Sequence, residues 1–220
     1  MSEKSFKYLD LLNSEQRKAV ESTTGSLLVL AGAGSGKTRV LTFRILHLLY
    51  KKLSTPSQIL AVTFTNKAAN EMKSRIERLI NLPIDRMWVG TFHSLSLRIL
   101  RQHYEEVGLR KNFVIIDTDD QIKLVKKICE AEKIDTKEVS AKYYINSIDS
   151  FKNKGITPEE LKENKYRKND KEIRKIYKLY QSELLRLNSV DFGDLILHCF
   201  NIFKKKKSVL IKYQSFFKYI

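Results

Sequence analysis

The residues best suited to chemistry form a glycine-rich loop that ends in a lysine and a threonine. The loop matches the phosphate-binding pattern G-x-x-x-x-G-K-[ST] except at its first position, and it reads Ala31-Gly32-Ala33-Gly34-Ser35-Gly36-Lys37-Thr38. Glycines let the backbone turn its N–H groups toward phosphate oxygens, and a helix after the loop adds its positive end. Lys37 would reach the β- and γ-phosphates of a nucleotide and the Thr38 hydroxyl would ligate Mg²⁺, so both are candidate catalytic residues. A loop without a ligand is the alternative, but it does not explain why lysine and threonine follow the last glycine.

A second candidate site consists of two phenylalanines that each follow an apolar run and have polar neighbours. Ligands bind at the carboxyl edge of open parallel sheets, and an aromatic face beside hydroxyl and amide groups there suits a sequence-tolerant grip on single-stranded DNA. Burial in the core is the ordinary role of an isolated phenylalanine after a strand, and His93 could equally be a loop histidine with internal partners. The candidate DNA-contacting residues are Thr63, Phe64, Thr65, Asn66, Thr91, Phe92 and His93.

The elements that would position both sites alternate between strand and helix over the first half of the chain. Asn13 and Gln16 form a capping box that predicts a helix start. Predicted strands that alternate with predicted helices favour a parallel sheet with helices covering both of its faces. The apolar runs predict strands at 27–31, 59–63 and 87–90, and the amphipathic stretches predict helices at 38–50, 66–80 (capped by Asn66) and from 91 to about 106.

The second half of the chain is mostly helical in pattern. After a short strand-like run at 113–116, Thr118 and Gln121 form a capping box for a helix to about residue 132. Further helix starts are predicted at 135–138, at 157–160 after the terminator Gly155, and at 170 for a helix to 187. The tail at 216–220 is again apolar and typical of a strand. The sequence therefore predicts an α/β domain with a parallel sheet, interrupted by an all-helical insertion.

Five segments, in this order, resemble the motifs of superfamily one DNA helicases of the UvrD/Rep/PcrA type. Residues 12–17 are similar to the adenine-reading Q motif, and the loop extended through Arg39 is similar to motif I, where alanine commonly takes the first position. Residues 61–72 look like motif Ia and 90–94 like motif Ib. Residues 190–195 resemble the segment where the chain re-enters the ATPase domain. The five motifs cover essentially the whole chain.

The resemblance implies a RecA-like P-loop NTPase domain at 1–112 and 188–220 and a helical insertion subdomain at 113–187. It implies ATP and Mg²⁺ as cofactors, single-stranded DNA and single-strand/double-strand junctions as partners, and 3′–5′ unwinding with a role in DNA repair. Gln16 would read adenine, although it could serve only the capping box, and Arg39 would approach the nucleotide, although it could be a surface residue. The implied nucleotide-binding residues are Gln16, Ala31, Gly32, Ala33, Gly34, Ser35, Gly36, Lys37, Thr38 and Arg39.

In the resembled helicases the acids that organise Mg²⁺ lie in motif II, after the strand that 216–220 would begin. The 220 residues hold neither these acids nor the C-terminal helicase domains, so we expect this polypeptide alone to be catalytically inactive. A stand-alone nucleotide- or DNA-binding fragment is the alternative function. A kinase-like or transporter ATPase is a more distant one, because it does not explain motifs Ia and Ib.

Composition narrows the class of protein without choosing the function. The net charge of +16 is compatible with a polyanionic partner, but it is spread along the chain, and 204–207 is the single tight basic run. There is no apolar run of the roughly 20 residues that cross a bilayer and no signal-peptide core, so we expect a cytoplasmic protein. Cys129, Cys199 and Trp88 are expected in the core. Asp191 and Asp194 are spaced for helix capping, with a metal pair as the alternative.

Overall fold

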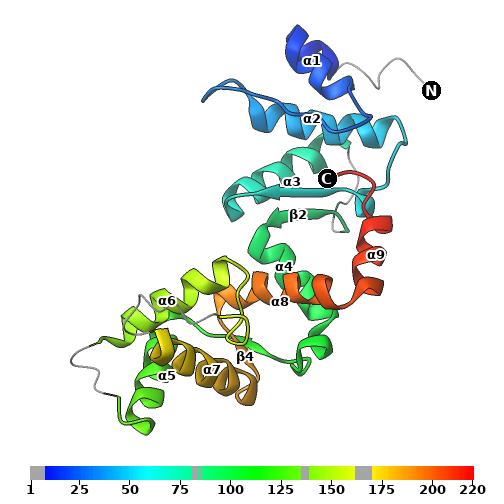
Figure 1. The fold of residues 1–220 in the computed structure, drawn as a ribbon. Coiled ribbons are helices and arrows are strands. Elements are labelled where there is room, and N and C mark those ends of the chain that lie inside the picture. Colours follow the sequence, from blue (N-terminus) through cyan, green and yellow to red (C-terminus); the bar gives the residue numbers. More distant parts are fainter. Residues whose placement is uncertain (1–7, 81–83, 85, 135–138, 162–169) are drawn as a thin grey trace. The chain divides into compact units, whose positions relative to one another are not determined.

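A computed structural model describes residues 8–80, 84, 86–134, 139–161 and 170–220 (Figure 1). The chain divides into two compact units, which are described separately below. The first unit contains residues 1–95 and 211–220, and the second contains residues 96–210. No helix among the described residues is long and apolar enough to cross a membrane.

The first unit is built around two parallel strands that follow one another along the chain. β1 pairs with β2 in a register that runs from Leu60 opposite Trp88 to Thr63 opposite Thr91. The two strands therefore end side by side at one edge. The elements of this unit are 3-10 turns at Leu9–Leu11 and Pro56–Gln58, α1 (Ser14–Glu21), α2 (Lys37–Tyr50), β1 (Leu60–Thr63), α3 (Asn66–Ile80), β2 (Trp88–Thr91), the start of α4 (Phe92–Gln102) and the end of α9 (Lys207–Phe216).

The core of the first unit lies between α2, α3 and the two strands. Ala69, Met72 and Ile76 bury one face of α3, because residues three and four positions apart share a side of a helix. Trp88 is 4% exposed, which confirms its expected place in the core. The predicted helices at 38–50 and 66–80 are both confirmed, as are the strands at 59–63 and 87–90 to within a residue.

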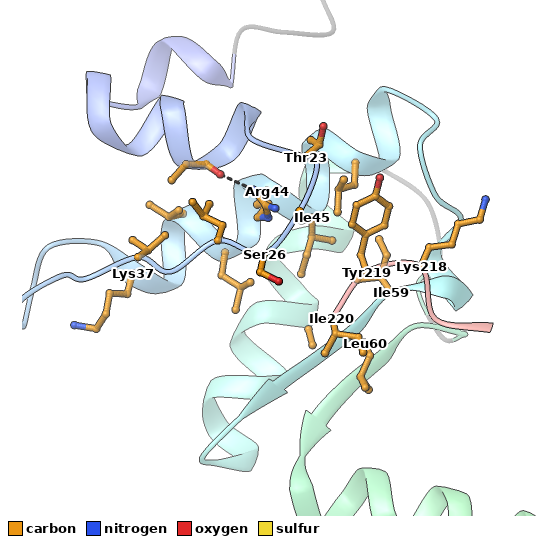
Figure 2. A pocket seen from close by; sticks show the side chains of 18 residues that line it. Thr23, Ser26, Lys37, Arg44, Ile45, Ile59, Leu60, Lys218, Tyr219 and Ile220 are labelled. Carbon is orange, nitrogen blue, oxygen red and sulfur yellow. Dashed lines mark hydrogen bonds between the residues drawn. The ribbon is translucent and has the colours of Figure 1, made fainter. Parts of the chain in front are cut away.

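The strand expected at 27–31 is wrong, because these residues form no strand. Leu28 is 81% exposed and Leu30 is 87% exposed. A cavity of about 670 Å³ is lined by this segment and by residues 59–61 of β1 and its approach (Figure 2). An apolar run becomes a buried strand only where a neighbouring strand supplies ladder hydrogen bonds, and no described strand pairs with this one. The predicted strand at 216–220 is present only as a single parallel bridge between Tyr219 and Ile59.

The second unit is mainly helical, with one short pair of parallel strands. Its core packs α5, α6 and α7 around the buried rings of Tyr144, Tyr177 and Tyr180. Cys129 and Cys199 are free and buried, which agrees with the expectation of reduced core residues. The elements are the end of α4, a 3-10 turn at Tyr104–Val107, β3 (Val114–Ile115), α5 (Thr118–Ala131), α6 (Ala141–Asn153), α7 (Asp170–Arg186), β4 (Ser189–Val190), α8 (Phe192–Lys205) and the start of α9.

Two predicted helix caps are displaced by one residue. The hydroxyl of Thr65, rather than the side chain of Asn66, accepts the backbone N–H of Ala68 at the start of α3. The carboxylate of Asp117, rather than Thr118, accepts from the next turn at the start of α5. In both places neighbouring residues can cap, and the one just outside the first turn does so because only there does its oxygen reach the free N–H groups.

The remaining helix boundaries had mixed outcomes. Gly155 follows α6 with a φ of +70°, which confirms it as a terminator. Residues 157–160 form a turn, with Thr157 N–H bonded to the Glu160 carboxylate, and no helix begins there among the described residues. The start expected at 135–138 lies outside the described residues.

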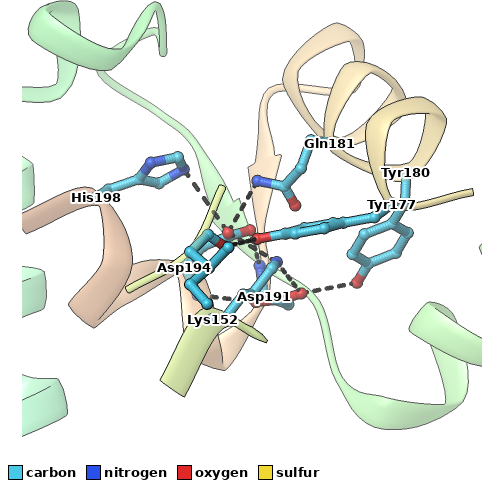
Figure 3. Close-up of polar contacts among 8 residues, drawn as sticks. Lys152, Tyr177, Tyr180, Gln181, Asp191, Asp194 and His198 are labelled. Carbon is cyan, nitrogen blue, oxygen red and sulfur yellow. Dashed lines mark hydrogen bonds and ion pairs between the residues drawn. The ribbon is translucent and has the colours of Figure 1, made fainter. Parts of the chain in front are cut away.

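A buried ion cluster joins α6 to the start of α8 in the second unit (Figure 3). The ammonium of Lys152 lies 2.6 Å from an oxygen of Asp191 and 2.7 Å from one of Asp194, and all three side chains are almost fully buried. The two aspartates also cap each other's backbone N–H groups, which confirms the capping role. Tyr180 donates to Asp191 and Gln181 donates to Asp194.

The charges of this cluster explain why the aspartates do not form a metal pair. Burial and the neighbouring Asp194 raise the pKa of Asp191. Burial alone would raise the pKa of Asp194 as well, but the ammonium of Lys152 lowers it. The lysine occupies the position that a cation would take, and no group of three potential metal ligands occurs among the described residues.

Removing the charge of Lys152 should destabilise the protein strongly. Lys152→Met leaves two buried carboxylates without a counter-charge, which should lower the free energy of unfolding by about 3–5 kcal/mol. Urea unfolding followed by circular dichroism measures this change. The matched control is Lys204→Met, which removes an exposed lysine paired with Glu160 and should leave the stability nearly unchanged. Equal effects of the two substitutions would contradict the structural role of the buried cluster.

Candidate nucleotide-binding site

The glycine-rich loop reverses direction immediately before α2. Gly34 and Gly36 have φ values of +75° and +88°, in the left-handed region that glycine adopts without steric cost. Within the loop, the backbone N–H and the hydroxyl of Ser35 both donate to Gly32 O, at 3.4 and 2.6 Å. The first helical bond of α2 runs from Val40 N–H to Gly36 O at 2.9 Å. The bend is therefore fixed at both of its ends, and it leads directly into the positive end of a 14-residue helix.

The open side of the loop has room for a ligand. A Cβ atom built on Gly32 or on Gly34 would meet no atom within 4 Å. Lys37 bends back along the loop, and its ammonium donates to Ala31 O at 3.0 Å and to Gly32 O at 2.7 Å. Thr38 is exposed in the first turn of α2. A loop of this form, one flexible cation and one free hydroxyl are the parts that a Mg²⁺-nucleotide needs.

Gln16 is held against the loop by its own side-chain amide. Its Nε2 donates to Ser35 O at 3.1 Å, and its Oε1 accepts the backbone N–H of Asn13 at 3.2 Å. The second half of the predicted capping box is also present, since Gln16 N–H donates to Asn13 Oδ1 at 2.9 Å. These contacts fix which end of the amide is the donor. Each end keeps one further hydrogen-bonding position, so capping and base recognition are compatible.

The side chain of Arg39 contacts the segment that precedes α1. Its guanidinium donates to Leu11 O at 2.6 Å and lies 5.6 Å from the centroid of the Phe43 ring. Arg39 is exposed and lies two residues beyond Lys37, on the side of α2 that carries the segment with Gln16.

The two candidate DNA-contacting phenylalanines lie at the adjacent ends of β1 and β2. Phe64 is 98% exposed and Phe92 is 61% exposed, which excludes the core role for both. The paired register places the preceding residues, Thr63 and Thr91, opposite each other. Two aromatic faces at the same edge of the sheet are therefore presented to solvent.

The polar neighbours of these rings mostly have structural partners. Thr65 caps α3, and Thr91 exchanges hydrogen bonds with Ser94 at the start of α4. Thr91 Oγ1 also lies 3.4 Å from Asn66 Oδ1, which joins the two strand ends. His93 is half-buried, and burial lowers its pKa, so the ring is neutral near pH 7. The aromatic rings are thus the most available groups at this edge.

Comparisons with known proteins decide the family. The sequence model of the UvrD/REP helicase N-terminal domain matches residues 12–220. The chain belongs to this family. A helicase of Staphylococcus epidermidis named ATP-dependent DNA helicase PcrA is 44% identical over 209 residues, and its namesake in Staphylococcus aureus is 42% identical over 212 residues. These matches cover 95% and 96% of this chain and 29% of each relative, so the chain spans less than a third of their length.

Arg44, which the sequence analysis did not single out, lines the same cavity as Lys37. Arg44 of α2 donates to Ala19 O at 2.7 Å and makes a second close contact with Ser22 O, at the end of α1. Its partners are backbone carbonyls, which leave no residue-type signal in the sequence. Burial lowers the pKa of its guanidinium. The one sign of this contact in the sequence was an arginine at a half-buried position of α2.

Substitution of Gly36 should damage both the fold and the site. In Gly36→Ala the new Cβ would lie 3.0 Å from Gln16 Nε2, at a φ of +88° that costs an L-residue roughly 1–2 kcal/mol. We expect thermal unfolding at a lower temperature. Gly32→Ala is the matched control for stability, because its Cβ would meet nothing and its φ is not left-handed. A Gly36→Ala protein as stable as Gly32→Ala would show that the loop does not hold this conformation in solution.

Proposed function

We propose that this chain is the ATP-binding and single-stranded-DNA-binding N-terminal part of an ATP-dependent 3′–5′ DNA helicase. The relatives it matches are named as ATP-dependent DNA helicases, and they share 42–44% of its residues over nearly its whole length. The observation that carries the proposal is the loop with Gln16 bonded to Ser35 O on one side and Lys37 on the other.

The nucleotide role of the loop follows from charge and geometry. The β- and γ-phosphates would replace the carbonyl partners of Lys37, because an ammonium prefers an anionic oxygen to a neutral one. The free N–H groups in the first turn of α2 face the same ligand, and Thr38 would hold Mg²⁺, which supplies charge neutralisation at the phosphates. The proposed nucleotide set is that of the sequence prediction, residues 31–39 with Gln16.

The DNA role rests on the exposed rings of Phe64 and Phe92. The two rings lie at neighbouring strand ends, and each base of a single strand offers a face on which a ring can stack. Adjacent rings at one edge would contact successive bases. The neighbours Thr63, Thr65, Asn66, Thr91 and His93 would contribute contacts to the sugar-phosphate chain.

The architecture fits the helicase proposal at the level of domains. We assign residues 1–112 and 188–220 to a RecA-like ATP-binding domain and 113–187 to a helical insertion. The compact units divide at other positions because α8 packs against α6 of the helical part. The proposal has three further parts, which rest on the family resemblance. These are unwinding of single-strand/double-strand junctions, a role in DNA repair and a cytoplasmic location.

We further propose that a polypeptide of these 220 residues binds ATP but hydrolyses it slowly. No Asp-Glu pair occurs among them to organise Mg²⁺ and the attacking water. Residues from the rest of a helicase would supply these groups and the second ATPase domain. A stand-alone binding module explains the geometry equally well but gives no reason for the family match across residues 12–220.

Lys37→Ala should remove most of the affinity for Mg²⁺-ATP without unfolding the protein. A charge-assisted hydrogen bond contributes roughly 1.5–3 kcal/mol, so we expect at least about tenfold weaker binding in titration calorimetry. The control Lys142→Ala removes an exposed lysine of α6 and should bind as the unsubstituted chain does. If folded Lys37→Ala retained full affinity, or if the unsubstituted chain did not bind Mg²⁺-ATP, the nucleotide proposal would be wrong.

Phe64→Ala should weaken binding to a single-stranded oligonucleotide. Loss of one stacking ring costs roughly 1–3 kcal/mol of binding free energy, measured by fluorescence anisotropy. The fold should be unaffected, because the ring is 98% exposed. Phe200→Ala is the matched control, since Phe200 is a half-exposed ring of α8 that belongs to neither proposed site. An unchanged DNA affinity in Phe64→Ala would remove this residue from the DNA face.

A further inference from the structure

The helix that carries Gln16 has little of its own to hold it in place. α1 has eight residues, and Val20 is its single buried side chain. Helices of this length are not stable alone in water, so the orientation of α1 depends on contacts with its neighbours. The closest neighbour is α2, which begins at the phosphate loop (Figure 1).

Arg44 connects the end of α1 to α2 through backbone carbonyls. Its Nη1 donates to Ala19 O at 2.7 Å (Figure 2). It also contacts Ser22 O. The last carbonyls of a helix have no partner within the helix, and a cation near them is favourable. At the other end of the segment, Arg39 donates to Leu11 O, two residues before the N-cap Asn13. Two arginines of α2 therefore hold α1 at both ends.

The position of the Gln16 amide depends on this attachment. Gln16 lies one turn before Ala19, and its Nε2 reaches the loop at Ser35 O. A small rotation of α1 would move the amide relative to the loop, and displacements of about 1 Å are enough to lose a directional contact. Arg44 lines the same cavity as Lys37, but its guanidinium bonds carbonyls at the end of α1 and not the loop.

We infer that Arg44 is a positioning residue for recognition of the nucleotide base, because it fixes α1 on α2 and thereby holds the Gln16 amide in register with the phosphate loop. This inference rests on the proposed nucleotide function. Two different cations of α2 would then determine base selectivity and phosphate binding. Lys37 acts on the triphosphate, and Arg44 acts on the base through α1.

The test compares Mg²⁺-ATP with Mg²⁺-ITP, whose base carries a carbonyl oxygen in place of the amino group. The oriented amide of Gln16 accepts from the amino group but cannot accept from the carbonyl. Arg44→Met should reduce the ratio of ATP affinity to ITP affinity at least about fivefold in titration calorimetry, with little change for ITP. Arg44→Lys, which keeps a donor, should retain most of the ratio.

Two further variants separate positioning from general stability. Arg78→Met is the matched control, because the Arg78 guanidinium bonds a carbonyl of its own helix, Ser74 O, and joins no two elements. It should leave the ratio unchanged. In the double variant Gln16→Ala with Arg44→Met, the ratio should fall no further than in Gln16→Ala alone, since both changes remove the same contact. An additive fall, an unchanged ratio in Arg44→Met, or an equal loss for both nucleotides would overturn the inference.

The inference can fail separately from the proposed function. If the unsubstituted chain binds no nucleotide, hydrogen exchange of the free protein still tests the attachment of α1. In Arg44→Met the amides of α1 should exchange faster while those of α2 keep their rates. Unchanged exchange in α1 would overturn the role of Arg44 whether or not the loop binds ATP.

Discussion

The left-handed backbone of Gly36 is the constraint on which the candidate nucleotide site depends. Its φ of +88° turns the chain out of the loop and into α2, and its carbonyl accepts the first bond of that helix from Val40. The absence of a Cβ also lets the Gln16 amide approach the loop, since a methyl group there would lie 3.0 Å from Nε2. One residue thus sets the direction of the helix dipole, the place of Lys37 and the distance to the Gln16 amide. A side chain at this position would disturb all three at once.

The two units solve the problem of holding polar groups in different ways. In the first unit the polar contacts near the loop join cations and amides to backbone carbonyls, as Arg39 and Arg44 do with the segment around α1. Such contacts are partly exposed to solvent. In the second unit Lys152 is enclosed with Asp191 and Asp194, and every member of the cluster is desolvated. Breaking that cluster would leave a buried charge, so it fixes the return of the chain into α8 and is unsuited to binding.

Sequence patterns predicted the helices well, because a helix is determined by residues that are close to one another in the chain. The apolar spacing of α3 gave its bounds, and the reciprocal Asn13–Gln16 cap was visible in the sequence. The failures have causes that are distant in the chain. The run at 27–31 has strand propensity but pairs with no described strand, and Lys152 meets Asp191, which lies 39 residues later in the chain. The single local sign of that cluster was a lysine on the apolar face of α6, in line with Ile145 and Ile148.

The register between β1 and β2 determines where the two candidate DNA-contacting rings lie. From sequence alone, Phe64 and Phe92 were candidates for DNA contact, with burial in the core as the alternative because each follows an apolar strand. The pairing of Thr63 with Thr91 brings the two rings to one edge, and their exposure to solvent shows that they do not pack in the core. Thr65 and Thr91 beside them cap α3 and α4, whereas the two rings are exposed to solvent. Under the proposed function, two exposed aromatic faces at this edge would stack on bases without reading them, and that is the kind of contact a protein needs if it is to act on single strands of any sequence.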